Sequence, residues 1–537
     1  MTSSTASPWA AHLDDPASFE PAQLTEGGTM PALWAARWER EPSAPVLRFE
    51  GEGSRDRWRT AGQLDEATRR AAALLAAAGL SAGERMVWSA EPSFDAVVSC
   101  LAALRLGAVV VPANLTYTER ELGHVVADTR PAVVVVERPD QAAWVAAAAP
   151  GLLAALRPDL SYHGSPHESS HRSGTGNGDA AREPELDTAG ADDPALIVYT
   201  SGTTGSPKGA VLSHGNLLAA VRSLALGWRW QPDDRLVLAL PLFHVHGLCA
   251  GLFGTLTAGA SSVVLPKFSP DAVLGAAGKH SATLYFGVPT MYHRLLGSGR
   301  AGELSRLRLC ISGSAPLPTP LWSSLRREAD VAVLERYGMT ETMLTVSNPY
   351  DGERRPGTVG FPLPGVVARL TAFDDGGSGA GAAAEVEPTE GQLLVSGPSV
   401  FGGYWERPAA TEDAFEGRWF RTGDLAGRDA DGYLSILGRR HDLILSGGFN
   451  VYPAEVEDVL LAHPDVAEVA VAGEPSDEWG ETVVAWVVPG DARPGAADLE
   501  ALAADRLAPY KRPRHYRLVG SLPRNAMGKV QRDRLGR

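Results

Sequence analysis

The chain has 537 residues, more than one ordinary hydrophobic core accommodates, so more than one domain is expected. Hydrophobic residues make up 44% and charged residues 21%, which is normal for a globular protein. The net charge of −15, from 49 Lys and Arg against 64 Asp and Glu, argues against a general nucleic-acid binder.

The cysteines and the apolar runs also exclude several classes of protein. Cys100, Cys249 and Cys310 are scattered without a pair motif, which disfavours a disulfide framework or zinc site and fits a reducing cytoplasm. The N-terminus lacks the basic start and apolar core of a secretory signal. The best candidate for a membrane span, Val97 to Pro112, is interrupted by Arg105, so no membrane segment is expected.

The first half of the chain alternates between strand and helix patterns. Residues 1–30 are predicted to be a loosely ordered extension, and an alanine- and leucine-rich helix is predicted over 64–80. Buried strands are predicted at 86–89 and 108–111, with a helix between them, and at 133–136. This β-α-β alternation indicates an α/β fold with parallel or mixed sheets and helices on their faces.

Two stretches are predicted to be loops. Residues 163–190 are almost free of apolar side chains and are interpreted as a mobile connector. The connector carries His163, His167 and His171, but too few supporting ligands to favour a metal site. Residues 374–384 are rich in Gly and Ala and are predicted to join two strands.

The character of the chain changes after Gly438, and residues 439–537 are predicted to form a small mobile α+β domain. Its expected strands and helices are 442–446, 453–461, 466–472, 483–488 and 498–507, the last with Asp498 as N-cap. From Arg506 onward there are ten Lys and Arg against one acidic residue, which indicates a lid that meets an anionic substrate. Residues 31–438 are then the large N-terminal domain.

The most informative stretch is YTSGTTGSPKGA, residues 199–210, which follows a strand predicted at 195–198. Glycines let backbone N–H groups close around an anion, hydroxyls add donors, and Lys208 adds a charge. The loop is therefore predicted to bind a polyphosphate. It is not a Walker A loop, because Lys208 is followed by Gly209 rather than by Ser or Thr.

Four further motifs follow in order: LPLFHVHG (240–247), ERYGMTET (335–342), RTGDL (421–425) and PRNAMGK (523–529). Together with the phosphate loop they resemble the adenylate-forming superfamily of acyl-CoA synthetases, carrier-loading adenylation domains and luciferases. The resemblance runs from about residue 30 to the C-terminus and implies that superfamily's fold, with a large AMP-binding domain and a C-terminal lid. It also implies a two-step reaction, in which ATP activates a carboxylate as an acyl-adenylate and a thiol then takes the acyl group.

The resemblance assigns roles to the residues that match the motifs. The β- and γ-phosphates would be held by Thr200, Ser201, Gly202, Thr203, Thr204 and Lys208. Thr340 would contact the α-phosphate, and Glu341 with Thr200 would hold Mg²⁺, a cation that favours oxygen ligands. The adenosine would be bound by Tyr337, Asp424 and Arg439, while His244 would lie between the acid and nucleotide sites and Lys529 would stabilise the charge that develops during adenylation.

Charged residues near the acid pocket indicate a substrate with a second negative charge. Arg294 ends the segment GVPTMYHR, Arg336 lies within ERYGMTET, and His246 follows His244 by two residues, so both would share one side of a strand. A buried arginine requires a partner, and a carboxylate supplies a bidentate one. These segments resemble malonyl-CoA synthetases, including those that accept methylmalonate, which implies that Arg294 binds the free carboxylate with His246, Ser314 and Arg336 around it.

The resemblance further implies coenzyme A as the thiol, with Gly447 and Gly448 beside the pantetheine arm. The hinge position, usually Asp or Lys in the superfamily, is His441, so domain rotation is predicted to depend on pH. Three alternatives remain: a ligase for another short or medium acid, an enzyme that loads a carrier protein, and a nucleotide-binding pseudoenzyme. The expected substrates are a small dicarboxylic acid, ATP and coenzyme A, without nucleic-acid or membrane partners.

Overall fold

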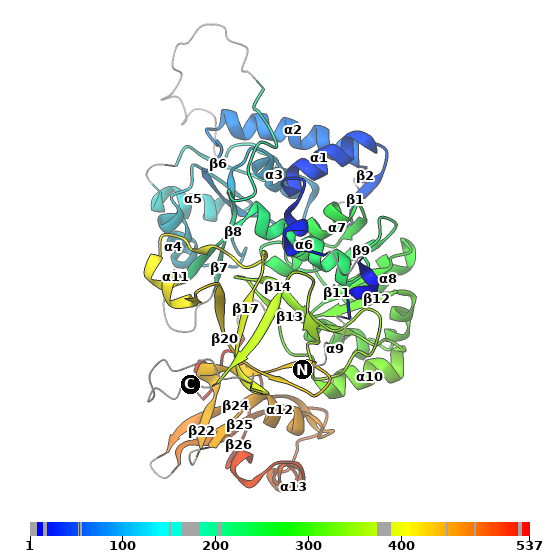
Figure 1. Ribbon diagram of the computed structural model, residues 1–537, viewed down its shortest axis with the longest axis vertical. Helices are drawn as coiled ribbons and strands as arrows, with labels where there is room; N and C mark the ends of the chain where they lie inside the picture. The colour runs from blue at the N-terminus through cyan, green and yellow to red at the C-terminus, as the bar shows by residue number, and fades with distance from the viewer. Residues whose placement is uncertain are drawn as a thin grey trace.

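The protein is described here by a computed structural model that covers residues 8–13, 19–51, 53, 56–149, 152–163, 183–200, 207–372, 388–446, 449–476, 479–524 and 529–536. Figure 1 shows a large body of sheets and helices, with the C-terminal elements forming a smaller unit at one end of it. The predicted fold class, α/β with a large N-terminal domain and a small α+β C-terminal domain, is confirmed.

Two large sheets form the N-terminal body. In the described residues the first has nine strands in the order β15-β14-β13-β12-β11-β9-β10-β1-β2. Its strands are β1 (Pro45–Phe49), β2 (Trp58–Thr60), β9 (Arg235–Leu238), β10 (Ser261–Val264), β11 (Leu284–Gly287), β12 (Leu309–Ser312), β13 (Leu334–Met339), β14 (Met343–Ser347) and β15 (Phe361–Pro362). The inner strands from β12 to β1 pair in parallel, as expected of a sheet covered by helices on its faces.

The second large sheet carries the phosphate-loop motif. Seven strands of the described chain follow the order β18-β8-β7-β4-β3-β5-β6. They are β3 (Arg85–Ser89), β4 (Val109–Pro112), β5 (Val133–Val136), β6 (Ala154–Leu156), β7 (Pro194–Thr200), β8 (Lys208–Ser213) and β18 (Gly403–Tyr404). All four valines of β5 are buried, which is why this uninterrupted apolar run forms an inner parallel strand.

Helices and short helical turns cover these sheets. They are η1 (Ala10–His12), η2 (Pro21–Thr25), α1 (Met30–Arg40), α2 (Ala61–Ala77), α3 (Phe94–Arg105), α4 (Glu119–Thr129), α5 (Pro139–Ala148), α6 (His214–Gly227), η5 (His246–Phe253), α7 (Gly254–Ala258), α8 (Pro270–Lys279), α9 (Pro289–Gly297), η6 (Ala301–Arg306), α10 (Thr319–Ala329) and α11 (Pro408–Ala414). Several begin at capping boxes, among them α4 at Thr118 with Glu121 and α6 at Ser213 with Asn216. No helix within the described ranges is both long and apolar enough to cross a bilayer.

Two smaller sheets complete the fold, the first antiparallel and the second mixed. The first has β16 (Val367–Thr371), β17 (Glu390–Ser396), β19 (Phe415–Glu416), β20 (Trp419–Arg428) and β21 (Leu434–Arg439). The second has β22 (Ile444–Ser446), β23 (Phe449–Val451), β24 (Val466–Ser476), β25 (Gly480–Pro489) and β26 (His515–Leu518), with η7 (Arg440–Asp442), α12 (Pro453–Leu461), α13 (Ala496–Arg506), η8 (Pro509–Lys511) and η9 (Arg532–Arg534). The second sheet is mixed because β26 pairs parallel with β25. The chain passes from one sheet to the other between Arg439 and Ile444, the place proposed from the sequence for the domain joint.

The N-terminal segment differs from the expectation of a loosely ordered extension. Trp9 is only 2% exposed, and its indole N–H donates to the carbonyl of Pro362 at 2.6 Å. The His12 ring contacts the Leu226 carbonyl through Nδ1 and the Asp351 carboxylate through Nε2. Residues 8–13 therefore pack against the large domain, because the Trp9 side chain is buried there next to Pro362, a residue far away in the sequence.

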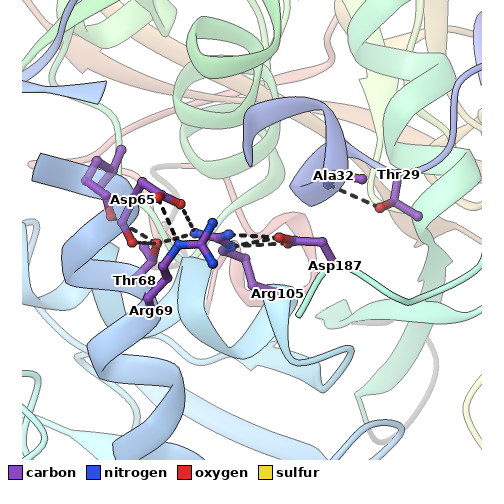
Figure 2. A network of polar contacts seen from close by, with 8 residues as sticks. Thr29, Ala32, Asp65, Thr68, Arg69, Arg105 and Asp187 are labelled. Carbon is purple, nitrogen blue, oxygen red and sulfur yellow. Dashed lines mark hydrogen bonds and ion pairs between the residues drawn. The ribbon is translucent and has the colours of Figure 1, made fainter. Parts of the chain in front are cut away.

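A buried arginine binds Asp187, near the C-terminal end of the connector predicted at 163–190, so this part of the segment departs from the prediction of a mobile connector. Figure 2 shows Arg105 between Asp187 on one side and Asp65 and Thr68 on the other. The Arg105 side chain is fully buried and donates to Asp187 through Nε and Nη2. The arginine that interrupts the apolar run of α3 is thus paired inside the protein, which removes the cost of an isolated buried charge.

The other connector predictions fall partly outside the described residues. His167, His171 and all of 374–384 lie there, but strands flank the second segment as predicted: β16 and β17, which pair antiparallel. The predicted N-cap Asp498 is wrong, because α13 begins at Ala496 with Gly495 as its N-cap. Asp498 lies instead in the first turn, where a carboxylate interacts favourably with the helix dipole.

Candidate active site

The phosphate-loop motif forms the end of a β-hairpin. β7 and β8 pair antiparallel so that Thr200 stands opposite Lys208, and the Thr200 hydroxyl donates to the Lys208 carbonyl at 3.4 Å. Ser201, Gly202, Thr203 and Thr204 lie outside the described residues. The two described ends of the loop therefore lie on adjacent strands, with the Thr200 and Lys208 side chains both partly exposed.

A tyrosine that the motif analysis missed lies between Lys208 and Glu341. The Lys208 ammonium is 5.3 Å from the centre of the Tyr404 ring, within range of a cation–π interaction. The Tyr404 hydroxyl donates to Glu341 Oε1 at 2.9 Å. Burial raises the pKa of Glu341, and the hydrogen bond from Tyr404 partly opposes that shift. Tyr404 belongs to none of the sequence motifs. The local signal that could have identified it is its position directly after Gly402 and Gly403.

Glu341 has the chemistry expected of a magnesium ligand. Its carboxylate is buried, and a bound cation would offset the desolvation of the charged form. Mg²⁺ takes oxygen ligands and usually binds through one or two carboxylates together with substrate phosphates. Among the described residues no group of three or more His, Cys, Asp or Glu could hold a metal by itself, so phosphate oxygens would have to complete the shell.

The expected adenosine residues come together from three strands. The Tyr337 hydroxyl on β13 donates to Asp424 Oδ2, and Arg439 Nε lies 2.7 Å from Asp424 Oδ1. Asp424 and Arg439 are register partners on β20 and β21, so the sheet itself places them opposite each other. Asp424 is 3% exposed and is the shared partner of Tyr337 and Arg439. Thr340, which directly precedes Glu341, is half-buried.

The two histidines lie in a tight turn rather than on one strand, so the predicted strand geometry is wrong. The His246 backbone N–H donates to His244 Nδ1 at 3.2 Å, and His246 begins the π-helical segment η5. Burial lowers the pKa of His244 to about 4, helped by the nearby charges of Arg336 and Lys529. Burial also lowers the pKa of His246, so both rings are neutral near pH 7.

Buried His246 and Arg336 and half-buried Ser314 form a polar group. The Ser314 hydroxyl lies 3.4 Å from His246 Nδ1, and the His246 ring is parallel to that of Phe286. Within the described part of the chain, His246 Nε2 has no hydrogen-bond partner. The same is true of Nε and Nη2 of Arg336, a side chain that is 5% exposed and whose pKa is lowered by burial.

Arg336 lies against the SGSAP turn. A Cβ atom at Gly313 would come within 2.3 Å of Arg336 Cζ, so a side chain at this position would displace the guanidinium. The neighbouring Glu335 does not neutralise the guanidinium through a hydrogen bond; its Oε1 accepts from the Leu317 backbone N–H at 2.8 Å. Burial raises the pKa of Glu335 to about 8. Arg336 therefore has unused donors and a need for an anionic partner.

Arg294 is placed elsewhere. It is exposed on α9, and its guanidinium lies 5.1 Å from the centre of the Phe268 ring. In the described residues no ion pair or hydrogen bond joins it to Glu335, His246, Ser314 or Arg336. Its predicted role toward the acid stays a prediction.

Residues of the small domain reach the same place. The charges of Arg439, Asp424 and Asp442 all act on Lys529, and the charge of Lys529 acts on His244. The Lys529 side chain is exposed. Desolvation by the surrounding atoms nevertheless lowers its pKa, and the positive charge of Arg439 lowers it further. Gly447 and Gly448 lie outside the described residues, as does the side chain of His441.

Comparison with known proteins follows the same division of the chain. The model described as "AMP-binding enzyme" matches residues 34–405, and the model "AMP-binding enzyme C-terminal domain" matches residues 455–529. A malonate–CoA ligase of Arabidopsis thaliana is 36% identical over 488 residues, which cover 84% of this chain and 78% of the relative. A feruloyl-CoA synthase of Amycolatopsis sp is also 36% identical, over 94% of this chain and 98% of that protein.

A solved structure resembles the whole chain. The crystal structure of ATP-bound MatB from Rhodopseudomonas palustris has a TM-score of 0.83 and 39% identity, and the match covers 94% of this chain and 98% of that one. The likeness therefore extends over both domains as well as over the motifs.

Proposed function

The chain belongs to the AMP-binding enzyme family, and from this we propose that it is an ATP-dependent acid–CoA ligase that makes malonyl-CoA from free malonate. In the first step a carboxylate oxygen of malonate attacks the α-phosphorus of ATP, which releases pyrophosphate and leaves malonyl-adenylate. In the second step the sulfur of coenzyme A attacks the malonyl carbonyl carbon, and AMP leaves. Methylmalonate is a candidate for the same site.

The predicted site residues divide the work of the first step. Thr200 and Lys208 hold the terminal phosphates at the loop, and Asp424 with Arg439 orients the ribose beneath Tyr337. Glu341 would hold Mg²⁺, and the bound cation would stabilise the negative charge on the phosphates. Thr340 contacts the α-phosphate, and Ser201, Gly202, Thr203 and Thr204 add donors from the loop. Lys529 reaches the reacting oxygen and offsets the negative charge that grows there.

The observation that carries the choice of acid is the pair of unused donors on buried Arg336, beside His246 with its unpartnered Nε2. Both side chains are almost fully buried, at 5% and 2% exposure. A monocarboxylate bound through its reacting carboxylate would leave the guanidinium unneutralised in an apolar setting, at a cost of several kcal/mol. The second carboxylate of malonate supplies two charge-assisted hydrogen bonds in the geometry that a guanidinium prefers.

Replacing each of the two candidate arginines by methionine tests this assignment. Because the lost contacts are charge-assisted, Arg336→Met is expected to raise the KM for malonate roughly 100-fold, with the KM for ATP nearly unchanged. Arg294→Met removes an equal charge and serves as the matched control, with little change in either constant. A large rise in the malonate KM for Arg294→Met, with none for Arg336→Met, would return the role to Arg294.

Two related activities compete with this proposal. The feruloyl-CoA synthase relative makes an aromatic acid the main rival, and such an acid would require apolar walls where Arg336 and His246 lie. Gly447 and Gly448 are proposed to line the path of the pantetheine arm, which suits either coenzyme A or a carrier protein. Measuring acyl transfer to coenzyme A and to a phosphopantetheinylated carrier protein separates those two acceptors; we expect coenzyme A.

The three buried cysteines, free of disulfides, agree with a cytoplasmic location.

A further inference from the structure

Helix α4 lies against both ends of the phosphate loop, although no motif of the proposed site includes it. Asp128, near the C-terminal end of α4, accepts a hydrogen bond from the Tyr199 hydroxyl through Oδ2 at 2.6 Å. Tyr199 directly precedes Thr200 on β7. One helical turn earlier, His124 Nε2 lies 3.1 Å from the carbonyl of Pro207, which directly precedes Lys208. Helix α4 thus contacts Tyr199 on one side of the loop and Pro207 on the other.

Asp128 also binds the segment that follows β18. Arg407 Nη2 donates to Asp128 Oδ1 at 2.7 Å, and the Trp405 indole N–H donates to the Asp128 backbone carbonyl at 3.3 Å. The Asp128 side chain is 11% exposed, so its carboxylate is largely removed from water and shared between a phenol and a guanidinium. Such charge-assisted hydrogen bonds are stronger than neutral ones.

The segment that Asp128 binds also contacts β8, the strand that begins at Lys208. Tyr404 is the register partner of Ala210 on β8, and the Trp405 backbone N–H donates to the Gly209 carbonyl at 2.8 Å. The Tyr404 ring lies beneath the Lys208 ammonium and its hydroxyl donates to Glu341. Asp128 is therefore connected to one end of the loop through Tyr199 and to the other through the segment 404–407.

We propose that Asp128 is a positioning residue for ATP binding, which fixes the spacing of the two strands that present the phosphate loop. It touches neither ATP nor the acid; it acts through Tyr199 on Thr200 and through Arg407 on the Tyr404 ring below Lys208. The inference rests on the proposed function, because it requires that this hairpin binds the phosphates of ATP. A loop whose ends are held in place loses less conformational freedom when the phosphates bind, which favours affinity for ATP.

The direct test compares Asp128→Asn and Tyr199→Phe with a matched control. Asp128→Asn keeps the shape but removes the charge that Arg407 requires, and Tyr199→Phe keeps the ring but removes the hydroxyl. Asp234→Asn is the control, because Asp234 is also a buried partner of an arginine, Arg308, and of a hydroxyl, that of Thr283. Asp234 directly precedes β9, on the flank of the molecule opposite to α4 in Figure 1.

Three quantities are measured on the full chain: ATP binding by calorimetry without acid or coenzyme A, the steady-state constants, and thermal unfolding. For Asp128→Asn we expect the Kd and KM for ATP to rise about tenfold, with kcat and the KM for coenzyme A within about twofold of wild type. Tyr199→Phe is expected to act in the same direction more weakly. The double variant is expected to fall short of the product of the single effects, because the two groups form one contact.

The outcomes separate this inference from the proposed function. If the wild type binds ATP and forms an adenylate while Asp128→Asn and Tyr199→Phe leave the Kd for ATP unchanged, the positioning role is contradicted and the function stands. An equal rise in Kd for Asp234→Asn contradicts it too, because general destabilisation would then explain the effect. If the wild type neither binds ATP nor forms an adenylate with any acid, the proposed function itself fails.

Discussion

Lys529 is the side chain through which we propose that the small domain meets the nucleotide site, and its setting makes this role testable. It lies among Arg439, Asp424 and Asp442, with its charge felt by His244. A cation placed there stabilises negative charge on the α-phosphate during adenylation, but it has no part to play once the acyl-adenylate exists.

Lys529→Ala is therefore expected to slow adenylate formation roughly 100-fold or more, the usual effect of removing one charge-stabilising group. Thioester formation from supplied malonyl-adenylate and coenzyme A is expected to stay close to wild type. Pyrophosphate release and thioester formation, measured separately, check this. Lys511→Ala is the control, since Lys511 lies in the same domain but pairs with Glu455. Equal loss of both half-reactions in Lys529→Ala would contradict the role.

At the scale of single elements, Arg105 fixes the chain that leads into β7 and the phosphate loop. Asp187→Ala removes the carboxylate that receives two donors of this fully buried guanidinium, while Asp65 stays in place. Breaking a buried ion pair by removing one partner costs about 3 kcal/mol, so the melting temperature is expected to fall by several degrees. Calorimetry checks this, with Asp140→Ala as control because its pair with Arg138 is exposed. An unchanged melting temperature for Asp187→Ala would contradict the importance of this network.

Elements with a strong local pattern could be predicted from the sequence. Helix α12 was predicted at Pro453–Leu461 and β5 at Val133–Val136, and both have those bounds, because a proline start and an uninterrupted buried run are local signals. The turn that places His244 against the His246 N–H could not be predicted, because it depends on one hydrogen bond in a short apolar segment.

Contacts between distant segments are the second kind of feature that could not be predicted. Trp9 on Pro362, Asp128 on Tyr199 and Tyr404 on Glu341 each join residues more than 60 positions apart. The motifs identified Lys208 and Glu341, but Tyr404, which contacts both, belongs to no motif. The same reason explains why the sequence assigned the free carboxylate to Arg294, whereas Arg336 is the arginine that is buried near His246.

At the scale of the whole molecule, a hydrogen bond joins the two domains, and we propose that it favours the orientation needed for adenylation. The N-cap position of α10, Pro318, offers no side-chain acceptor. The backbone N–H of Thr319 donates instead to Asp458 Oδ1 of α12, at 3.2 Å. The small domain thereby satisfies one of the free N–H groups at the start of a helix in the large domain.

Asp458→Ala is expected to weaken this orientation by about 1 kcal/mol, the usual value of such a helix cap. The rate of adenylate formation should then fall about fivefold, while thioester formation from supplied adenylate is unchanged or faster. The two half-reactions are measured as for Lys529, with Glu455→Ala as a control on the same helix whose partner, Lys511, lies within the small domain. A loss confined to thioester formation would contradict the proposed role of this contact in adenylate formation.

The central claim, that the chain activates a short dicarboxylic acid, is tested most directly by one screen of the wild-type protein. Pyrophosphate release is measured with ATP, Mg²⁺, coenzyme A and, in turn, malonate, methylmalonate, succinate, acetate, butyrate and ferulate. Because Arg336 needs an anionic partner, kcat/KM for malonate or methylmalonate should exceed that for acetate, butyrate and ferulate by roughly 100-fold or more, and exceed that for succinate. A clear preference for butyrate, ferulate or any other monocarboxylate would contradict the account.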